Sequence, residues 1–155
     1  MTIGTDDGVE KYGTLTDLNS TSAAVADGQY SVAGDLATWT NSDDASRARL
    51  ALQWQYASGT LVASAYLSIH ARRINYTGVT DEEVPSDDYQ GAYVGRFLLD
   101  DGLATATNSQ SIADINLEGL KASQEYEFYI KNSSGVQISA GWDVEVVAVV
   151  TGPHA

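Results

Sequence analysis

Strict alternation of apolar and polar side chains is the feature of this chain that most restricts its fold. In SRARLALQWQY, residues 46–56, every second side chain is apolar. Successive side chains of a β-strand point to opposite faces of a sheet, so a period of two predicts a strand with one buried face. The apolar face consists of Ala48, Leu50, Leu52, Trp54 and Tyr56. We therefore predict a half-buried strand over residues 46–56.

The next two segments carry the same signal. After a break at Ser58-Gly59, the segment LVASAYLSIHARR, residues 61–73, alternates again, and we predict that it forms an antiparallel hairpin with 46–56. GAYVGRFLLD, residues 91–100, predicts a further strand that ends at the turn signal of residues 100–102. Its predicted inward face consists of Tyr93, Gly95, Phe97 and Leu99.

Two longer strands are predicted in the last third of the chain. The first points Tyr126, Phe128 and Ile130 inward and ends at the turn signal of residues 133–135. The return strand has an apolar face of Trp142, Val144, Val146, Ala148 and Val150. Shorter candidates lie at 30–33, 37–40 and 112–117. About eight short strands with no convincing helix predict an all-β fold, an antiparallel β-sandwich or jelly roll.

The chain is divided by composition into a polar N-terminal segment and one domain. Its 155 residues are the length of a single domain. Residues 1–28 are rich in Gly, Thr, Ser, Asp and Ala without a clear period, so we predict an extended N-terminal arm there and a β-sandwich domain over 29–155. Isolated apolar side chains in the arm have no core of their own, which makes them candidates for contacts with a partner. They are Ile3, Val9, Tyr12, Leu15 and Leu18.

Charge and composition exclude several classes of partner. The net charge of −13 repels a phosphate backbone, so we expect no nucleic acid and no anionic membrane as a partner. The longest apolar run, 146–150, is far shorter than the roughly 20 residues of a membrane helix. The start of the chain has no pattern of a secretory signal, and cysteine is absent, so we expect a protein made in a reducing cytosol without disulfides.

An acidic segment, TDEEVPSDDY at residues 80–89, is the first candidate site. An EF-hand calcium loop requires glycine at its sixth position, where this segment has Pro85. Looser calcium coordination by some of its carboxylates stays open beside the alternative of a solvated loop, because calcium accepts flexible oxygen cages. These weak calcium candidates are Asp81, Glu83, Asp87 and Asp88.

Catalytic signatures are missing from the sequence. It has no G-x-S-x-G elbow and no phosphate-binding glycine motif. His70 is interpreted as a surface residue on the polar face of a strand rather than as a general base, and His154 stands next to the last residue. Sugar binding rests on Trp39 and scattered tyrosines, because Trp54 and Trp142 fall on apolar strand faces. We expect no enzymatic activity and no cofactor.

Three phrases of the chain resemble a known class of proteins. They are MTIGTDDGVEKYGT, DLATWTNSDDASRARLALQWQYASG and SQEYEFYIKNSSG with ISAGWDVEVVAVVTGPHA. In overall texture the chain is similar to a family of small acidic virion structural proteins of tailed bacteriophages. The resemblance implies a capsid decoration, or cement, protein on the outside of the head, with a tail or baseplate component as the alternative. It also implies a homotrimer, the major capsid protein as partner, and a location in the virion after synthesis in the host cytoplasm.

Three hypotheses follow from the sequence and the resemblance. A virion structural protein associates with itself or with a shell and turns over no substrate. A carbohydrate-binding β-sandwich module is retained on a glycan and depends on Trp39. A metal-dependent enzyme or a calcium-stabilised domain has a melting temperature that falls when a chelator is added and in Asp87→Ala.

Overall fold

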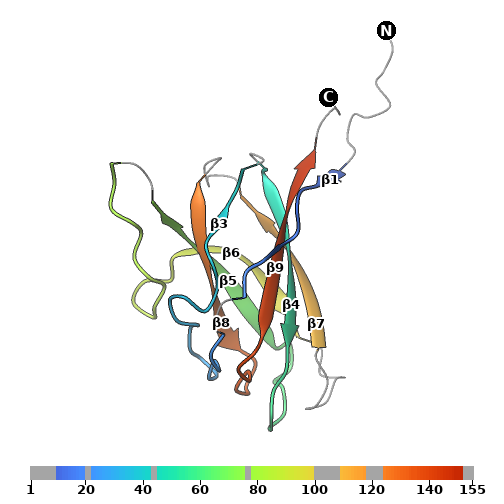
Figure 1. The fold of residues 1–155 in the computed structure, drawn as a ribbon. Coiled ribbons are helices and arrows are strands. Elements are labelled where there is room, and N and C mark those ends of the chain that lie inside the picture. The colour runs from blue at the N-terminus through green and yellow to red at the C-terminus, as the bar shows by residue number, and fades with distance from the viewer. Residues whose placement is uncertain are drawn as a thin grey trace.

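The fold is an all-β sandwich of two antiparallel sheets, as predicted. A computed structural model of the chain describes residues 10–19, 22–42, 45–75, 78–99, 109–117 and 124–151. These residues contain nine strands and no helix (Figure 1). The strands are β1 (Glu10–Tyr12), β2 (Thr16–Asp17), β3 (Trp39–Thr40), β4 (Arg47–Trp54), β5 (Tyr66–Ile74), β6 (Ala92–Leu98), β7 (Ser109–Asn116), β8 (Glu125–Ser133) and β9 (Asp143–Thr151).

The strand order identifies the sandwich as a jelly roll. One sheet has the order β1-β9-β4-β7, with β2 also paired to β9, and the other has the order β3-β8-β5-β6. Because β1 and β2 follow one another along the same edge of β9, they count as one interrupted strand. Strands of the first half of the chain then pair with those of the second half in reverse order, as in a long hairpin rolled into two sheets. We call the sheet that contains β9 the first sheet and the other the second sheet.

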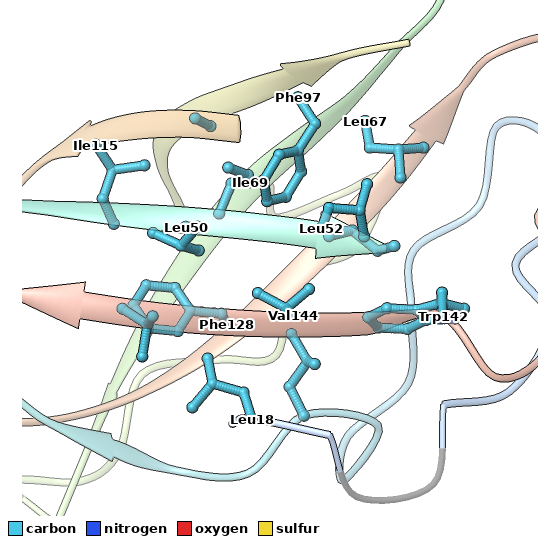
Figure 2. Close-up of a cluster of buried hydrophobic side chains, with 14 of the residues drawn as sticks. Leu18, Leu50, Leu52, Leu67, Ile69, Phe97, Ile115, Phe128, Trp142 and Val144 are labelled. Carbon is cyan, nitrogen blue, oxygen red and sulfur yellow. The ribbon is translucent and has the colours of Figure 1, made fainter. Parts of the chain in front are cut away.

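The core lies between the two sheets and is made by the predicted alternation. In the first sheet, every second residue of β4 and β9 is buried, from Ala48 to Trp54 and from Trp142 to Ala148. In the second sheet, Leu67 and Ile69 of β5 lie beside Phe97 of β6 and the inward residues of β8, and all of them point into the core (Figure 2). The predicted inward faces of residues 46–56 and of the two last strands are therefore confirmed.

One predicted strand pairing is wrong. The segments 46–56 and 61–73 do not form a hairpin, since β4 pairs with β7 and β9 whereas β5 pairs with β6 and β8. The turn after β8 likewise leads into the other sheet, where β9 lies. In a jelly roll, both connections cross the core from one sheet to the other, and the turn residues alone do not distinguish a crossing from a hairpin.

The predicted face of residues 91–100 is wrong at Tyr93. Phe97 and Leu99 are buried as predicted, but Tyr93 is exposed. The register between β5 and β6 shifts at this point, because Ile69 pairs with Gly95 whereas His70 pairs with Tyr93. Such a β-bulge inserts one extra residue and reverses the alternation beyond it. Tyr93 consequently points to the outer face of the second sheet.

The described part of the predicted arm belongs to the sandwich. β1 and β2 pair with β9, and Val25 forms a bridge with Ile138. The backbone of Leu18 donates to the Val144 carbonyl at 2.8 Å and accepts from the Ala37 amide at 2.7 Å, so this segment joins the two sheets along one side. The side chain of Leu18 is fully buried in the core (Figure 2). A boundary at residue 28 therefore does not separate an arm from the domain.

Leu18 is expected to be essential for stability although it lies in a polar segment. We expect Leu18→Ala to lower the free energy of unfolding by about 3 kcal/mol, because it leaves a cavity between the sheets. Leu15→Ala, three residues away at a side chain that is 56% exposed, should change it by less than about 0.5 kcal/mol. Urea denaturation followed by tryptophan fluorescence measures both. Equal effects of the two substitutions would contradict the placement of Leu18.

Candidate functional site

The residues predicted to contact a partner separate into three groups. Ile3 and Val9 lie outside the described residues. Tyr12 and Leu15 are 51% and 56% exposed at the β1/β2 edge of the first sheet. Leu18, in contrast, is a core residue and is not available to a partner, which corrects the prediction. A polar sequence context does not show that a segment lies outside the core, because a single apolar side chain such as Leu18 can enter it from an edge strand.

Apolar side chains are also exposed beside the opposite edge of the sandwich. β7 is the last strand of the first sheet and β6 the last strand of the second, and the two strands approach each other at Gly95, where an added Cβ would lie 2.8 Å from Ile115 Cγ2. Leu98 of β6 is 60% exposed and Ile112 of β7 is 67% exposed. The sandwich therefore presents large apolar side chains at both of its edges.

Charged residues form a ladder across the outer face of the first sheet. Glu10 of β1 pairs with Arg47 of β4, and Arg49 of β4 pairs with Asp114 of β7 at 2.7 Å. The Tyr12 hydroxyl accepts a hydrogen bond from Arg49 and the ring lies under its guanidinium. Hydrogen bonds from Arg49 hold the pKa of Asp114 below its ordinary value. Because these pairs are exposed, each contributes little to stability, but together they connect three strands.

The acidic segment at residues 80–89 folds back onto the second sheet. The Glu82 carboxylate accepts hydrogen bonds from the backbone and the guanidinium of Arg73, at 2.9 and 2.7 Å. Partial burial raises the pKa of Glu82, but the bonds from Arg73 outweigh this effect and the pKa lies below its ordinary value. Asp87 pairs with Lys131 of β8 at 2.9 Å. Two of the five acids of this segment thus fasten it to the second sheet.

The calcium candidates are not brought together. Asp81 accepts a hydrogen bond from the backbone N–H of Asn75 at 2.8 Å, and Asp87 is paired with Lys131. Glu83 and Asp88 are exposed. Within the described ranges, no group of three or more histidines and acids has the geometry to hold a metal ion. The structure therefore gives the calcium hypothesis no site among the four candidates.

Trp39 is a core residue, which removes the basis of the predicted sugar site. It is only 6% exposed, and its ring centroid lies 6.3 Å from that of Tyr126 and 6.0 Å from that of Phe128. The short strand β3 pairs with β8 and turns this side chain between the sheets. A side chain that is only 6% exposed leaves too little of the ring free for a sugar to stack on.

His70 is buried on the outer side of the second sheet, so its interpretation as a surface residue is wrong. It is 3% exposed, because Tyr30 and Tyr93 cover it edge-on and the backbone of Gln90 lies against it. A carbonyl can only accept, so Nδ1 donates to the Gln90 oxygen and Nε2 accepts from the Ser68 hydroxyl at 2.9 Å. Burial lowers the pKa of His70, and the ring is neutral at pH 7. Both nitrogens are therefore engaged in structural bonds; His154 lies outside the described residues.

A cleft of about 350 Å³ opens beside His70 on this outer face. Strands β5, β6 and β8 supply its floor, and residues before β3 and before β6 supply its walls. The lining consists of Tyr30, Tyr66, Ser68, His70, Gln90, Tyr93, Arg96, Lys131 and Ser133. Aromatic, cationic and hydroxyl groups thus converge in one place that the sequence did not indicate.

A second feature missed by sequence reasoning is a pair of acids, Asp17 of β2 and Asp143 of β9. Asp143 lines a pocket of about 310 Å³ with Glu145, Gln53 and others, and its Oδ1 is buried with no hydrogen-bond partner in the part of the chain that the structure describes. Burial raises the pKa of Asp143, and the negative charge of Asp17 raises it further. Two neighbouring carboxylates repel each other when both are ionised. The pair therefore opposes the docking of β2 onto β9 at neutral pH.

Comparison with known proteins gives no relative: the chain matches no family model, no curated protein and no solved structure. Among the described residues there is no helix that is long and apolar enough to cross a membrane. The assignment of a function therefore depends on the features described above and on the resemblance of the sequence.

Neutralising Asp143 is expected to stabilise the protein at neutral pH. A raised folded-state pKa contributes stability that is present at low pH and is lost as the pH rises through that pKa. We expect Asp143→Asn to raise the melting temperature at pH 7 by about 2–4 °C, corresponding to about 1 kcal/mol. The gain should vanish towards pH 3, where Asp143 is protonated in both states. Scanning calorimetry against pH measures it.

The control for this experiment is Asp88→Asn, at an exposed carboxylate in the loop between β5 and β6. It removes the same formal charge without altering the contact between β2 and β9. An equal gain in both variants would assign the effect to the net charge of −13 and would contradict a specific role of the pair.

Proposed function

We propose that the chain is a non-enzymatic structural protein of a tailed-phage virion, and that it decorates the outer surface of the head. The observation that carries the proposal is the exposure of apolar side chains at both edges of the sandwich, namely Tyr12 and Leu15 at one edge and Leu98 and Ile112 at the other. Exposed apolar groups on a strongly acidic protein indicate surfaces that another protein covers.

The fold supports the proposal by analogy. Jelly rolls occur in viral capsid proteins and also in lectins, so the architecture alone does not decide the function. The resemblance of the sequence to small acidic virion proteins favours a viral structural protein over a lectin. In that setting the major capsid protein is the partner, and the protein is made in the host cytoplasm before it joins the particle.

The positions of the two edges support a ring-shaped assembly. They lie on opposite sides of the sandwich, since β1 and β7 are the outermost strands of the first sheet. A contact of one edge with the opposite edge of the next copy is heterologous, and heterologous contacts close into a ring when the rotation allows it. A homotrimer is the smallest ring of this kind that matches a local threefold position on a shell.

Binding to the assembled shell explains how such a protein stabilises a head. A protein that binds the shell but not its dissociated subunits shifts the assembly equilibrium by its binding free energy at every site. Many copies of modest affinity are therefore sufficient. The negative charge keeps free copies apart until they meet the shell.

Location in the particle tests the proposal directly. Gold-labelled antibody against the purified protein should mark the heads of intact particles of the phage that encodes the chain. Label on the tail or baseplate would support a virion structural protein but would overturn the proposed decoration of the head. Particles without any label would overturn the proposal as a whole.

The two apolar edges are tested by matched substitutions. We expect Leu15→Asp and Ile112→Asp each to reduce incorporation into particles, and the population of trimers in sedimentation, by at least about tenfold, because a buried anchor in an interface is worth about 2 kcal/mol or more. Val79→Asp is the control, since Val79 is 60% exposed in the loop between β5 and β6, which joins β6 at the end opposite to Leu98. Normal incorporation and assembly of both edge variants would show that the edges are not interfaces.

A further inference from the structure

The cleft beside His70 has the properties of a preformed binding site. Tyr66, Ser68 and His70 are alternate residues of β5 and therefore project from the same face of the second sheet. The two bonds of the His70 ring, to Ser68 and to the Gln90 carbonyl, fix the floor of the cleft. A ligand would meet a surface that is already ordered, which lowers the entropic cost of binding.

Arg96 supplies a positive charge that has no ion pair among the described residues. Each of Arg47, Arg49, Arg72 and Arg73 has an ion pair with an acid. Arg96 lines the cleft with its guanidinium 5.7 Å from the centroid of the Tyr66 ring, and the described part of the chain offers it no carboxylate within ion-pair distance. In a protein with 21 acids and eight basic residues, an arginine left in this state is available to a bound anion.

The other cation of the cleft is already neutralised. Lys131 pairs with Asp87 at 2.9 Å and lies 4.9 Å from the centroid of the Tyr30 ring. Among the described residues that line the cleft, Arg96 is therefore the one cation that is available to a ligand, so the cleft can neutralise one anionic group and not several. A polyanion such as nucleic acid is further disfavoured by the net charge of −13.

Hydroxyl and aromatic groups define the rest of the ligand. The Tyr30 hydroxyl is buried and has no hydrogen-bond partner among the described residues, which is costly unless a bound group satisfies it. Gln90 and Ser133 add further polar groups to the walls. Tyr93 is 59% exposed and gives the rim an aromatic ring on which a flat apolar face can lie. A ligand with several hydroxyls, one apolar face and one anionic group matches this lining.

We propose that the cleft binds an acidic sugar, a pyranose that carries one carboxylate. Arg96 receives the carboxylate, Tyr93 covers the apolar face of the ring, and the hydroxyls bond to Tyr30, Gln90 and Ser133. This site differs from the one predicted at Trp39, which is packed in the core on the other side of the second sheet. The proposal does not depend on a location in a virion, since the site is contained in one subunit.

Titration of the isotope-labelled protein, followed by NMR, tests the proposal. The probes are the methyl glycosides of glucuronic, galacturonic and N-acetylneuraminic acid, with methyl glucoside and methyl galactoside as neutral counterparts. At least one acidic sugar should shift the amide signals of the cleft at millimolar concentration, and its neutral counterpart should bind at least about tenfold more weakly. Absence of shifts with all three acids, or equal binding of the neutral sugar, would overturn the proposal. Acetate that binds as well as the sugars would also overturn it.

Matched substitutions assign the binding to the cleft. Arg96→Gln should weaken the acidic sugar at least about tenfold, because a charge-assisted bond to the carboxylate is lost. Arg49→Gln removes the same charge from the outer face of the other sheet and should leave the affinity unchanged. Tyr93→Ala should weaken acidic and neutral sugars alike, since it removes stacking and no charge. Unchanged affinity in Arg96→Gln would overturn the assignment.

An acidic side chain of a second copy is the competing occupant of the cleft. In that case Arg96→Gln would alter sedimentation, and the sugar would not shift the signals of the cleft in the assembled protein. We expect the assembly state of Arg96→Gln to equal that of the unsubstituted chain. A change in assembly without sugar binding would show that a neighbouring subunit, and not a sugar, occupies the cleft.

Discussion

The pairing of β9 on both of its edges is the interaction on which the rest of the structure depends. β4 pairs with one edge of β9 from Asp143 to Val149, and β1 and β2 pair with the other. A shift of this register by one residue would turn Trp142 and Val144 outward and bring Asp143 and Glu145 into the core. The cost of burying two carboxylates fixes the register more firmly than the hydrogen bonds alone do.

Local patterns predicted the strands and their buried faces but not their partners. The alternation in 46–56 and in the last two strands is a property of each segment and was sufficient to assign their inward residues. The assignment of β4 and β5 to different sheets depends on pairings with strands far along the chain. The residues of the turn between β4 and β5 do not indicate these pairings. The burial of Leu18 and Trp39 has the same cause, because both enter the core through short strands that pair with β9 and β8.

The candidate sites were predictable to a smaller extent. Tyr12 and Leu15 were recognisable as apolar residues in a polar segment. The cleft, in contrast, depends on a β-bulge that turns Tyr93 outward and on two loops that close over His70, and neither follows from composition. The acidic segment was visible in the sequence, but its role is defined by Arg73 and Lys131, which the fold brings opposite to it. Asp17 and Asp143 meet only because residues more than 120 positions apart lie on adjacent strands.

The pairing of Glu10 with Thr151 has a consequence for biosynthesis. A ribosome adds residues from the N-terminal end, so β4 and the segment around Leu18 emerge long before the strand that lies between them. Until β9 has left the exit tunnel, the first sheet lacks its second strand, and the inward side chains of β4 stay open to water and to other chains. The sandwich consequently closes only after β9 has been synthesised. Temporary protection of a nascent all-β chain by cellular chaperones is the expected counterpart of this topology.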